Sequence, residues 1–150
     1  MRAQSAAPEH PVCEALYAML SENKALAAAY LRFRWRAGGE RGRQLRSLFD
    51  AEEGVLTDAI QDIETMAESK CQDPQSHDGS DGVDIESLTL VASNGFAMIA
   101  LLAEGHRLAR FCAEAGAEVA QAEALEPETA WFKAQAAAHQ ASEARLLAAA

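Results

Sequence analysis

Apolar residues recur at helical spacing along most of the chain, and this periodicity is interrupted at three places. The interruptions are the Gly38-Gly39 pair, the polar run from Cys71 to Asp84, and a break at Leu125-Glu126-Pro127-Glu128. Alanine fills 34 of the 150 positions, against only four prolines and nine glycines, which favours long helices over a β-sandwich or barrel. The sequence therefore predicts an all-α fold with four long helices.

We expect these helices over residues 12–36, 42–70, 94–124 and 127–147. Ser93 or Asn94 suits the N-cap of the third helix, and Pro127 suits the first turn of the fourth. Tight turns make the first pair and the last pair antiparallel, while the long middle link lets the chain cross from one end of the bundle to the other. That arrangement is the ferritin-like four-helix bundle with one crossover.

Residues 1–150 are expected to form a single domain, with a flexible N-terminal segment (1–11), an acidic crossover loop (71–84) and a short crossover helix (85–92). Phe33 and Trp35 on the first helix and Phe96 on the third are expected in the core. Gly54, inside the second helix, is expected to allow close packing between helices.

Charge and cysteine content narrow the functional classes. The net charge is −10, yet the window from Arg32 to Arg46 holds six arginines and one acid, so the rest of the chain carries −15. Such a surface repels nucleic acid at long range and gathers cations. No apolar run is long enough to span a membrane. Three cysteines without paired spacing predict no disulfide framework and a cytoplasmic location.

Signatures of nucleotide-binding or hydrolytic enzymes are absent from the sequence. Neither a Glu-x-x-His nor a His-Glu-x-x-His pattern occurs. His106, on the third helix, is predicted to be a hydrogen-bonded histidine rather than a metal ligand.

The segment from Leu16 to Trp35 resembles the first helix of the Dps family, the mini-ferritins, which ends in an aromatic residue, H-W-N and a glycine. The second helix resembles the family's H-E-L-F-D run, written here Arg46-Ser47-Leu48-Phe49-Asp50. The match is gapless from Leu16 to about Glu64 and looser beyond, where the segment 85–92, Thr129-Ala130 and His139 resemble the family's crossover helix and fourth helix.

This resemblance implies a shell of twelve identical subunits and iron storage that protects against oxidative stress. It also implies iron oxidation at sites between two-fold-related subunits, and often DNA binding through lysine-rich tails. Lysine-rich ends are missing here, so we expect no DNA binding.

The family's iron-oxidation (ferroxidase) ligands are mostly replaced at the matching positions. Its two histidines fall on Arg34 and Arg46, its shared aspartate is kept as Asp50, and the acids from the facing subunit fall on Gln61 and Thr65. Arginine has no lone pair to donate and stays charged, so this set carries +1 and repels a divalent cation. The resemblance therefore implies a degenerate centre that holds no iron.

Several interpretations of these positions stay open. In one, Arg46 pairs with Asp50, and Arg34 joins them in an ion-pair network that occupies the position of the family's ferroxidase site. Alternatively, Arg34 and Arg46 bind an anion such as phosphate or sulfate. Relocated ligands elsewhere in the chain would give an oxidising enzyme.

Weaker metal candidates are acidic residues outside this set. Pairs one turn apart on the second helix could bind iron along a cage wall: Asp58 with Asp62, and Glu64 with Glu68. A second group, in the crossover, comprises His77, Asp78, Asp81 and Asp84.

The sequence thus predicts a Dps-like shell protein that stores or sequesters iron without oxidising it, alone or co-assembled with an active relative. The alternative is a structural or anion-binding assembly protein with no iron role.

Overall fold

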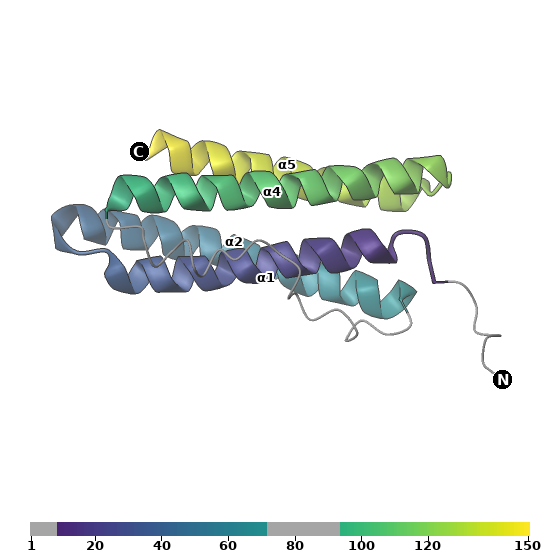
Figure 1. Ribbon diagram of the computed structural model, residues 1–150, viewed down its shortest axis with the longest axis horizontal. Coiled ribbons are helices and arrows are strands. Elements are labelled where there is room, and N and C mark those ends of the chain that lie inside the picture. Colours follow the sequence, from purple (N-terminus) through teal and green to yellow (C-terminus); the bar gives the residue numbers. More distant parts are fainter. Residues whose placement is uncertain (1–8, 72–93) are drawn as a thin grey trace.

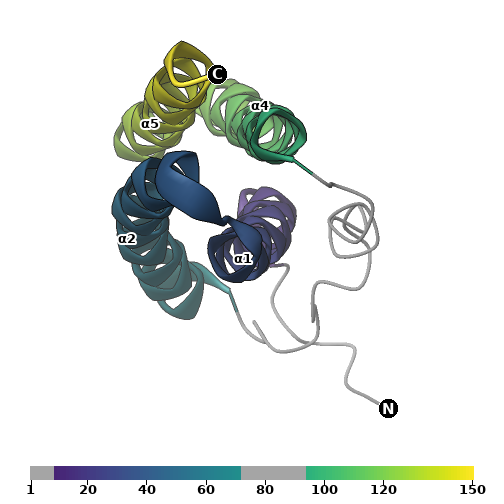
Figure 2. The same ribbon diagram turned by 90° about the vertical axis from the view of Figure 1, so that its left-hand side faces the viewer.

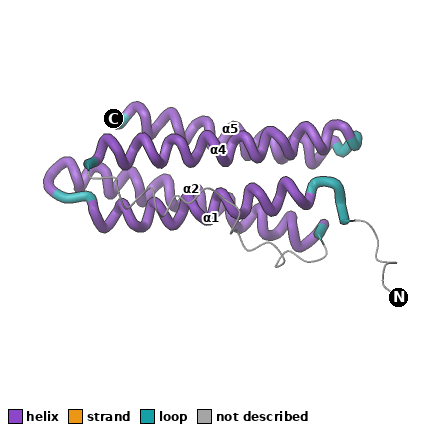
Figure 3. Tube along the Cα trace, viewed as in Figure 1, coloured by secondary structure: helices purple, strands orange, loops and turns teal. Residues whose placement is uncertain are grey.

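The computed structural model describes residues 9–71 and 94–150, and in that part of the chain all regular structure is helical (Figure 3). Its four helices are α1 (Cys13–Arg36), α2 (Gly39–Lys70), α4 (Gly95–Ala122) and α5 (Glu126–Ala148). They lie side by side as a four-helix bundle (Figure 1). The predicted all-α fold is confirmed, with helix boundaries within about three residues of those expected.

The order of the helices around the bundle follows from their directions. Viewed end-on, α1 and α2 lie side by side and α4 and α5 form the other pair (Figure 2). α1 and α2 are antiparallel, as are α4 and α5, whereas α2 and α4 run the same way, so α2 ends and α4 begins at opposite ends of the bundle. This is the one-crossover arrangement expected from the sequence. The predicted acidic loop beyond Cys71 and the short helix 85–92 lie outside the described residues, as does the crossover metal candidate.

Local chemistry fixes where the helices begin and end. The Asn94 side chain accepts a hydrogen bond from the Ala97 N–H at 2.8 Å, which caps α4 as predicted. Pro127 occupies the first turn of α5, where its missing N–H costs nothing. At the turn between α1 and α2, Gly39 has φ +75°, and a Cβ at Gly42 would lie 2.9 Å from the backbone of Ala37.

The α4–α5 connection is a Schellman turn with alanine at the position where glycine is usual. Ala124 has φ +58°, the Leu125 N–H donates to Ala120 O at 2.9 Å, and the Ala124 N–H donates to Gln121 O at 3.0 Å. These two hydrogen bonds satisfy two of the four carbonyls that the end of α4 leaves without partners inside the helix.

Two apolar clusters fill the bundle, one toward each end. The first surrounds Phe33, Phe49 and Leu102; the second surrounds Leu16, Ile63 and Phe132. Gly116 allows the second to close, because a Cβ there would overlap the ring of Phe132.

Three expectations about single residues are wrong. Trp35 is 82% exposed and Phe96 72% exposed, although both were expected inside. Positions 33 and 35 are about 200° apart on a helix, so burial of Phe33 turns Trp35 outward. A Cβ at Gly54 would have no neighbouring atom within 4 Å, so this glycine serves no close packing.

The prediction of unpaired cysteines is also wrong. Cys13, the first residue of α1, and Cys71, directly after α2, form a disulfide across the antiparallel pair, while Cys112 is free. A separation of 58 residues leaves no local spacing signal, because only the pairing of α1 with α2 brings the two together.

Candidate functional site

Two places in the bundle can be tested for metal chemistry: the outer face of α1 and α2, where the ferroxidase-like positions lie, and a polar network in the core. On the outer face, Arg34 Nε lies 3.2 Å from Asp50 Oδ1, and both side chains are about half exposed. Asp50, the one residue that the Dps resemblance would keep as a metal ligand, is therefore already paired with a fixed positive charge.

Arg46 lies close to this pair in sequence but has a different partner. Its guanidinium donates to the carbonyl oxygen of Ala37, the C-cap residue directly after α1. The expected Arg46–Asp50 pair is thus replaced by a hydrogen bond that satisfies a helix-terminal carbonyl. The interaction is possible because the turn at Gly38 brings the end of α1 against the first turns of α2.

Gln61 and Thr65 lie farther along the exposed face of α2, where Thr65 Oγ1 donates to the Gln61 carbonyl at 2.9 Å. Eleven residues of helix separate Gln61 from Asp50, about 16 Å at 1.5 Å per residue. Within one chain they cannot converge on Arg34 and Asp50. They can meet that pair only across an interface between subunits.

The acidic candidates on α2 form no ready-made cation site in one chain. Asp58, Asp62 and Glu68 are exposed, and Glu64 pairs with Lys24 at 3.4 Å. Within residues 9–71 and 94–150, the side chains of one group bring three metal-ligating atoms together, and that group contains none of these acids.

A hydrogen-bonded chain of three buried side chains crosses the core between the two apolar clusters. Tyr30 Oη lies 2.6 Å from His106 Nε2, and His106 Nδ1 lies 2.9 Å from His139 Nδ1. Tyr30 comes from α1, His106 from α4 and His139 from α5, and each is at most 4% exposed. The prediction of a hydrogen-bonded His106 is confirmed.

Burial keeps all three groups neutral. Desolvation lowers the pKa of His106 to about 3, with smaller contributions from His139 and Arg145, and lowers the pKa of His139 to about 4. Desolvation also raises the pKa of Tyr30, helped by the Glu52 carboxylate and opposed by Arg145. At neutral pH the network is a phenol and two uncharged imidazoles.

Neutrality fixes the direction of the chain. Each imidazole carries one N–H, so the contact between the two Nδ1 atoms joins one donor to one acceptor. If Tyr30 donates to His106 and His106 to His139, only the His139 Nε2–H lacks a partner among the described residues. The reverse direction would also leave the Tyr30 proton without an acceptor, which costs more. The assigned order is therefore Tyr30 to His106 to His139.

A buried carboxylate completes the polar core. Glu52 on α2 is 3% exposed and accepts two hydrogen bonds from Arg145, at 2.5 and 3.0 Å, while Arg145 also donates to Ser142 at 3.1 Å. This contact with Glu52 raises the pKa of Arg145 and keeps it charged. The Glu52 carboxylate is occupied by Arg145, and the Nδ1 lone pair of His139 is occupied by the proton on His106 Nδ1. Tyr30, Glu52, His106 and His139 therefore fit a packing role better than iron binding.

Sequence reasoning missed most of this network. Tyr30 sits on the apolar stripe of α1, and the signal that could have found the rest is polar residues at inward-facing positions: Glu52, His106 and His139. No local spacing links them, since each lies on a different helix.

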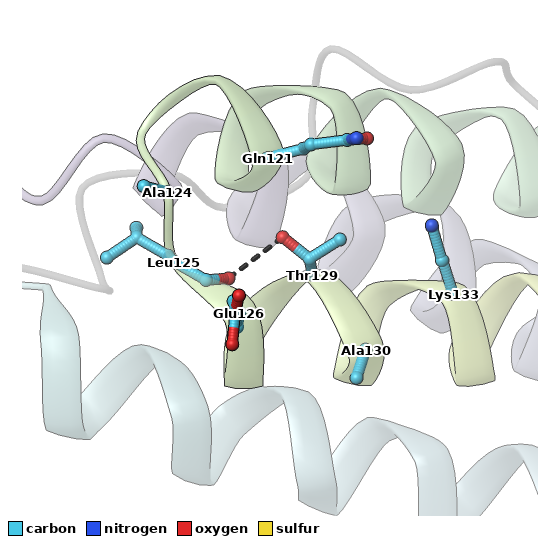
Figure 4. A pocket seen from close by; sticks show the side chains of 7 residues that line it. All are labelled: Gln121, Ala124, Leu125, Glu126, Thr129, Ala130 and Lys133. Atoms are coloured by element: carbon cyan, nitrogen blue, oxygen red, sulfur yellow. Dashed lines mark hydrogen bonds between the residues drawn. The ribbon is translucent and has the colours of Figure 1, made fainter.

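A shallow hollow of about 460 Å³ lies at the α4–α5 turn (Figure 4). Its lining includes Gln121, Glu126 and Lys133, all exposed, and Thr129 Oγ1 donates to the Leu125 carbonyl at 2.8 Å. The hydroxyl is thus engaged by a backbone carbonyl one turn earlier in the chain, and the hollow contains no pair of groups poised for catalysis.

The structure is similar to the X-ray structure of Dps from Thermosynechococcus elongatus, with a TM-score of 0.70. The fold is that of a Dps subunit. Sequence identity is 16%, and the match covers 90% of this chain and 87% of the Dps chain. No family model and no curated protein matches the sequence. The Dps resemblance is therefore confirmed at the level of the fold.

Among the described residues, no helix is both long enough and apolar enough to cross a membrane.

Proposed function

We propose that this chain, which has the Dps fold, assembles with other copies of itself into a shell and sequesters iron as cargo. The outer face of α1 and α2 does not oxidise this iron. The observation that carries the proposal is the ion pair between Arg34 and Asp50. It places a guanidinium against the one carboxylate that this face retains from the family's ligand set.

The charges at these positions oppose binding of ferrous iron. Arg34, Arg46, Asp50, Gln61 and Thr65 together carry +1, and the two guanidinium groups have no lone pairs to donate. Both arginines already have partners in the chain, Asp50 and the Ala37 carbonyl. That engagement supports an ion-paired, non-catalytic role for these positions over the anion-binding alternative.

Assembly is supported by exposed apolar side chains beside the Arg34–Asp50 ion pair. Trp35 and Leu31, 82% and 43% exposed, lie one turn apart on α1, and the Arg34 guanidinium sits 5.8 Å from the Trp35 ring centroid. Large exposed aromatics next to arginine are typical of the buried centres of protein interfaces. We therefore propose a homo-oligomer formed through this face, with twelve subunits as the resemblance to the Dps family implies.

The interface can be tested by multi-angle light scattering after size exclusion. Trp35→Ala should shift the wild-type oligomer toward smaller species while helical content stays constant. Leu147→Ala on α5, which removes a half-exposed apolar side chain from another helix, is the control and should leave the mass unchanged. A wild-type monomer, or an unchanged mass in Trp35→Ala, would contradict the proposed interface.

Iron sequestration is supported by charge. Outside the arginine window the chain carries −15, and Asp58 and Asp62 are exposed one turn apart on α2. An acidic shell concentrates cations near its surface. Aerobic loading followed by gel filtration should leave iron with the protein, and Asp58→Asn with Asp62→Asn should reduce the amount retained. Absence of retained iron would refute the storage role.

Oxidation is tested separately. Ferrous iron should oxidise in the presence of the wild-type protein no faster than in buffer, because Arg34 pairs with Asp50 and its positive charge repels the ferrous ion. Introducing Arg34→His, Arg46→His, Gln61→Asp and Thr65→Glu together should create saturable ferrous binding and faster oxidation. A saturating catalytic rate in the wild type would overturn the proposal.

A further inference from the structure

The most compact group of metal-ligating atoms in the described chain lies where α1 begins and α2 ends. One ligand atom from each of Glu9, Cys13 and Cys71 lies within 4.8 Å of the other two. Both cysteines are more than nine-tenths buried, whereas Glu9 is exposed, so the group has a buried sulfur side and an accessible carboxylate side.

Helix packing holds the two sulfurs together independently of the bond between them. Cys13 and Cys71 belong to the buried cluster that includes Leu16, Ile63 and Ala67, so the ends of α1 and α2 are packed against each other. The Cα atoms of the two cysteines are 5.8 Å apart. Reduction of the disulfide would therefore leave two thiols side by side.

Neighbouring contacts position the carboxylate and brace this end of the bundle. Tyr17 Oη donates to Glu9 Oε1 at 2.8 Å, which directs Glu9 back over the first turn of α1. Lys70 Nζ, one residue before Cys71, pairs with Glu128 Oε2 on α5 at 2.9 Å. This contact keeps Lys70 occupied and holds the pKa of Glu128 below its ordinary value.

We propose that the reduced protein binds one Zn²⁺ ion here, with Cys13 and Cys71 as thiolate ligands and Glu9 as the carboxylate ligand. Zn–S bonds of about 2.3 Å and Zn–O bonds of about 2.1 Å place tetrahedral ligand atoms about 3.6–3.8 Å apart, within the span of this group. The N-terminus of α1 at Cys13 favours a thiolate there. Three protein ligands leave one coordination position for water or an incoming ligand.

Zinc binding and the disulfide exclude each other because both use the same sulfur electrons. A low-molecular-weight disulfide supplies the oxidant: the two thiolates give up two electrons and form the Cys13–Cys71 bond, the S–S bond of the oxidant breaks, and its two thiolates leave and take up protons from water. Zn²⁺ then leaves, since disulfide sulfur is a poor ligand. The site is therefore a redox-controlled zinc site. It is separate from the Arg34–Asp50 pair on the outer face of α1 and α2 and independent of the proposed iron role.

Isothermal titration of Zn²⁺ into the full-length protein tests this assignment. Protein reduced with a non-thiol reductant should bind one Zn²⁺ per chain, and oxidised protein should lose this binding. Co²⁺ used as a probe should give a thiolate charge-transfer band in the reduced protein. Cys112→Ser is the matched control and should bind as the wild type does, because Cys112 lies on α4 outside the group.

Two variants separate the ligands from general effects on folding. Cys13→Ser with Cys71→Ser should abolish the charge-transfer band, with circular dichroism used to check the helices. Glu9→Gln, on an exposed side chain, should weaken Zn²⁺ binding at least tenfold while leaving the fold intact. Reduced wild-type protein that binds no Zn²⁺, or binding that survives in the double cysteine variant, would overturn the assignment. If Glu9→Gln binds Zn²⁺ as tightly as the wild type does, Glu9 is not a zinc ligand.

Discussion

The buried histidine pair predicts an unusually steep loss of stability in mild acid. His106 and His139 stay neutral in the folded protein, with pKa values of about 3 and 4, whereas unfolded histidine has a pKa near 6.5. Between these values the unfolded state takes up protons that the folded state cannot. Stability contributed by the pair is therefore full above about pH 7 and is lost as the pH falls toward 4.

The size of the effect follows from proton linkage. At pH 5.0 each unfolded imidazole gains about 2 kcal/mol from protonation relative to pH 7.5, so the pair costs the folded state about 4 kcal/mol. At a urea m-value of about 2 kcal/mol/M, this moves the unfolding midpoint by about 2 M. Such a loss is a large part of the total stability of a domain this size.

Urea unfolding followed by circular dichroism at pH 7.5 and 5.0, at one protein concentration, measures the difference. His139→Gln can still accept from His106 through its amide oxygen, and it should reduce the pH-dependent loss by about half. The matched control, His10→Gln, alters a histidine outside the core and should keep the wild-type difference. If His139→Gln and the wild type lose equal stability between the two pH values, the assignment of neutral buried imidazoles is refuted.

Two further predictions concern packing and the buried carboxylate, and both use the same unfolding assay. Gly116→Ala should destabilise the protein by about 1–3 kcal/mol because its Cβ would press on the buried Phe132 ring, whereas Gly54→Ala, in open space, should gain up to about 1 kcal/mol. Equal effects at the two glycines would contradict the packing described around Phe132. Arg145→Met should cost more than Glu52→Gln, by up to about 3 kcal/mol, because it leaves a charged carboxylate buried without its partner. Equal stability of those two variants would show that Glu52 is compensated by another group.

Local sequence signals were sufficient for the four described helices and for the two tight connections, between α1 and α2 and between α4 and α5. The helical periodicity, the Asn94 cap, Pro127 in the first turn of α5 and the break at Gly38 all describe interactions within a few residues. Their physical basis is short-range: one hydrogen bond or one backbone torsion decides each. An ion pair between Asp50 and an arginine was one of the interpretations open from the sequence. Its partner is Arg34 on α1 rather than Arg46, which lies one turn away on α2.

Exposure of single residues was harder to foresee. Trp35 and Phe96 are as apolar as their buried neighbours, and only the orientation of each helix decides which face is covered.

By itself, the sequence determined four helices and their order, because each of these depends on residue identity or on neighbours along the chain. Tertiary structure alone decided that Cys13 meets Cys71, that Arg46 reaches Ala37, and that Tyr30, His106 and His139 join in the core. These contacts depend on the direction and register in which separate helices pack, and a shift of one turn, about 5.4 Å, would separate every one of them.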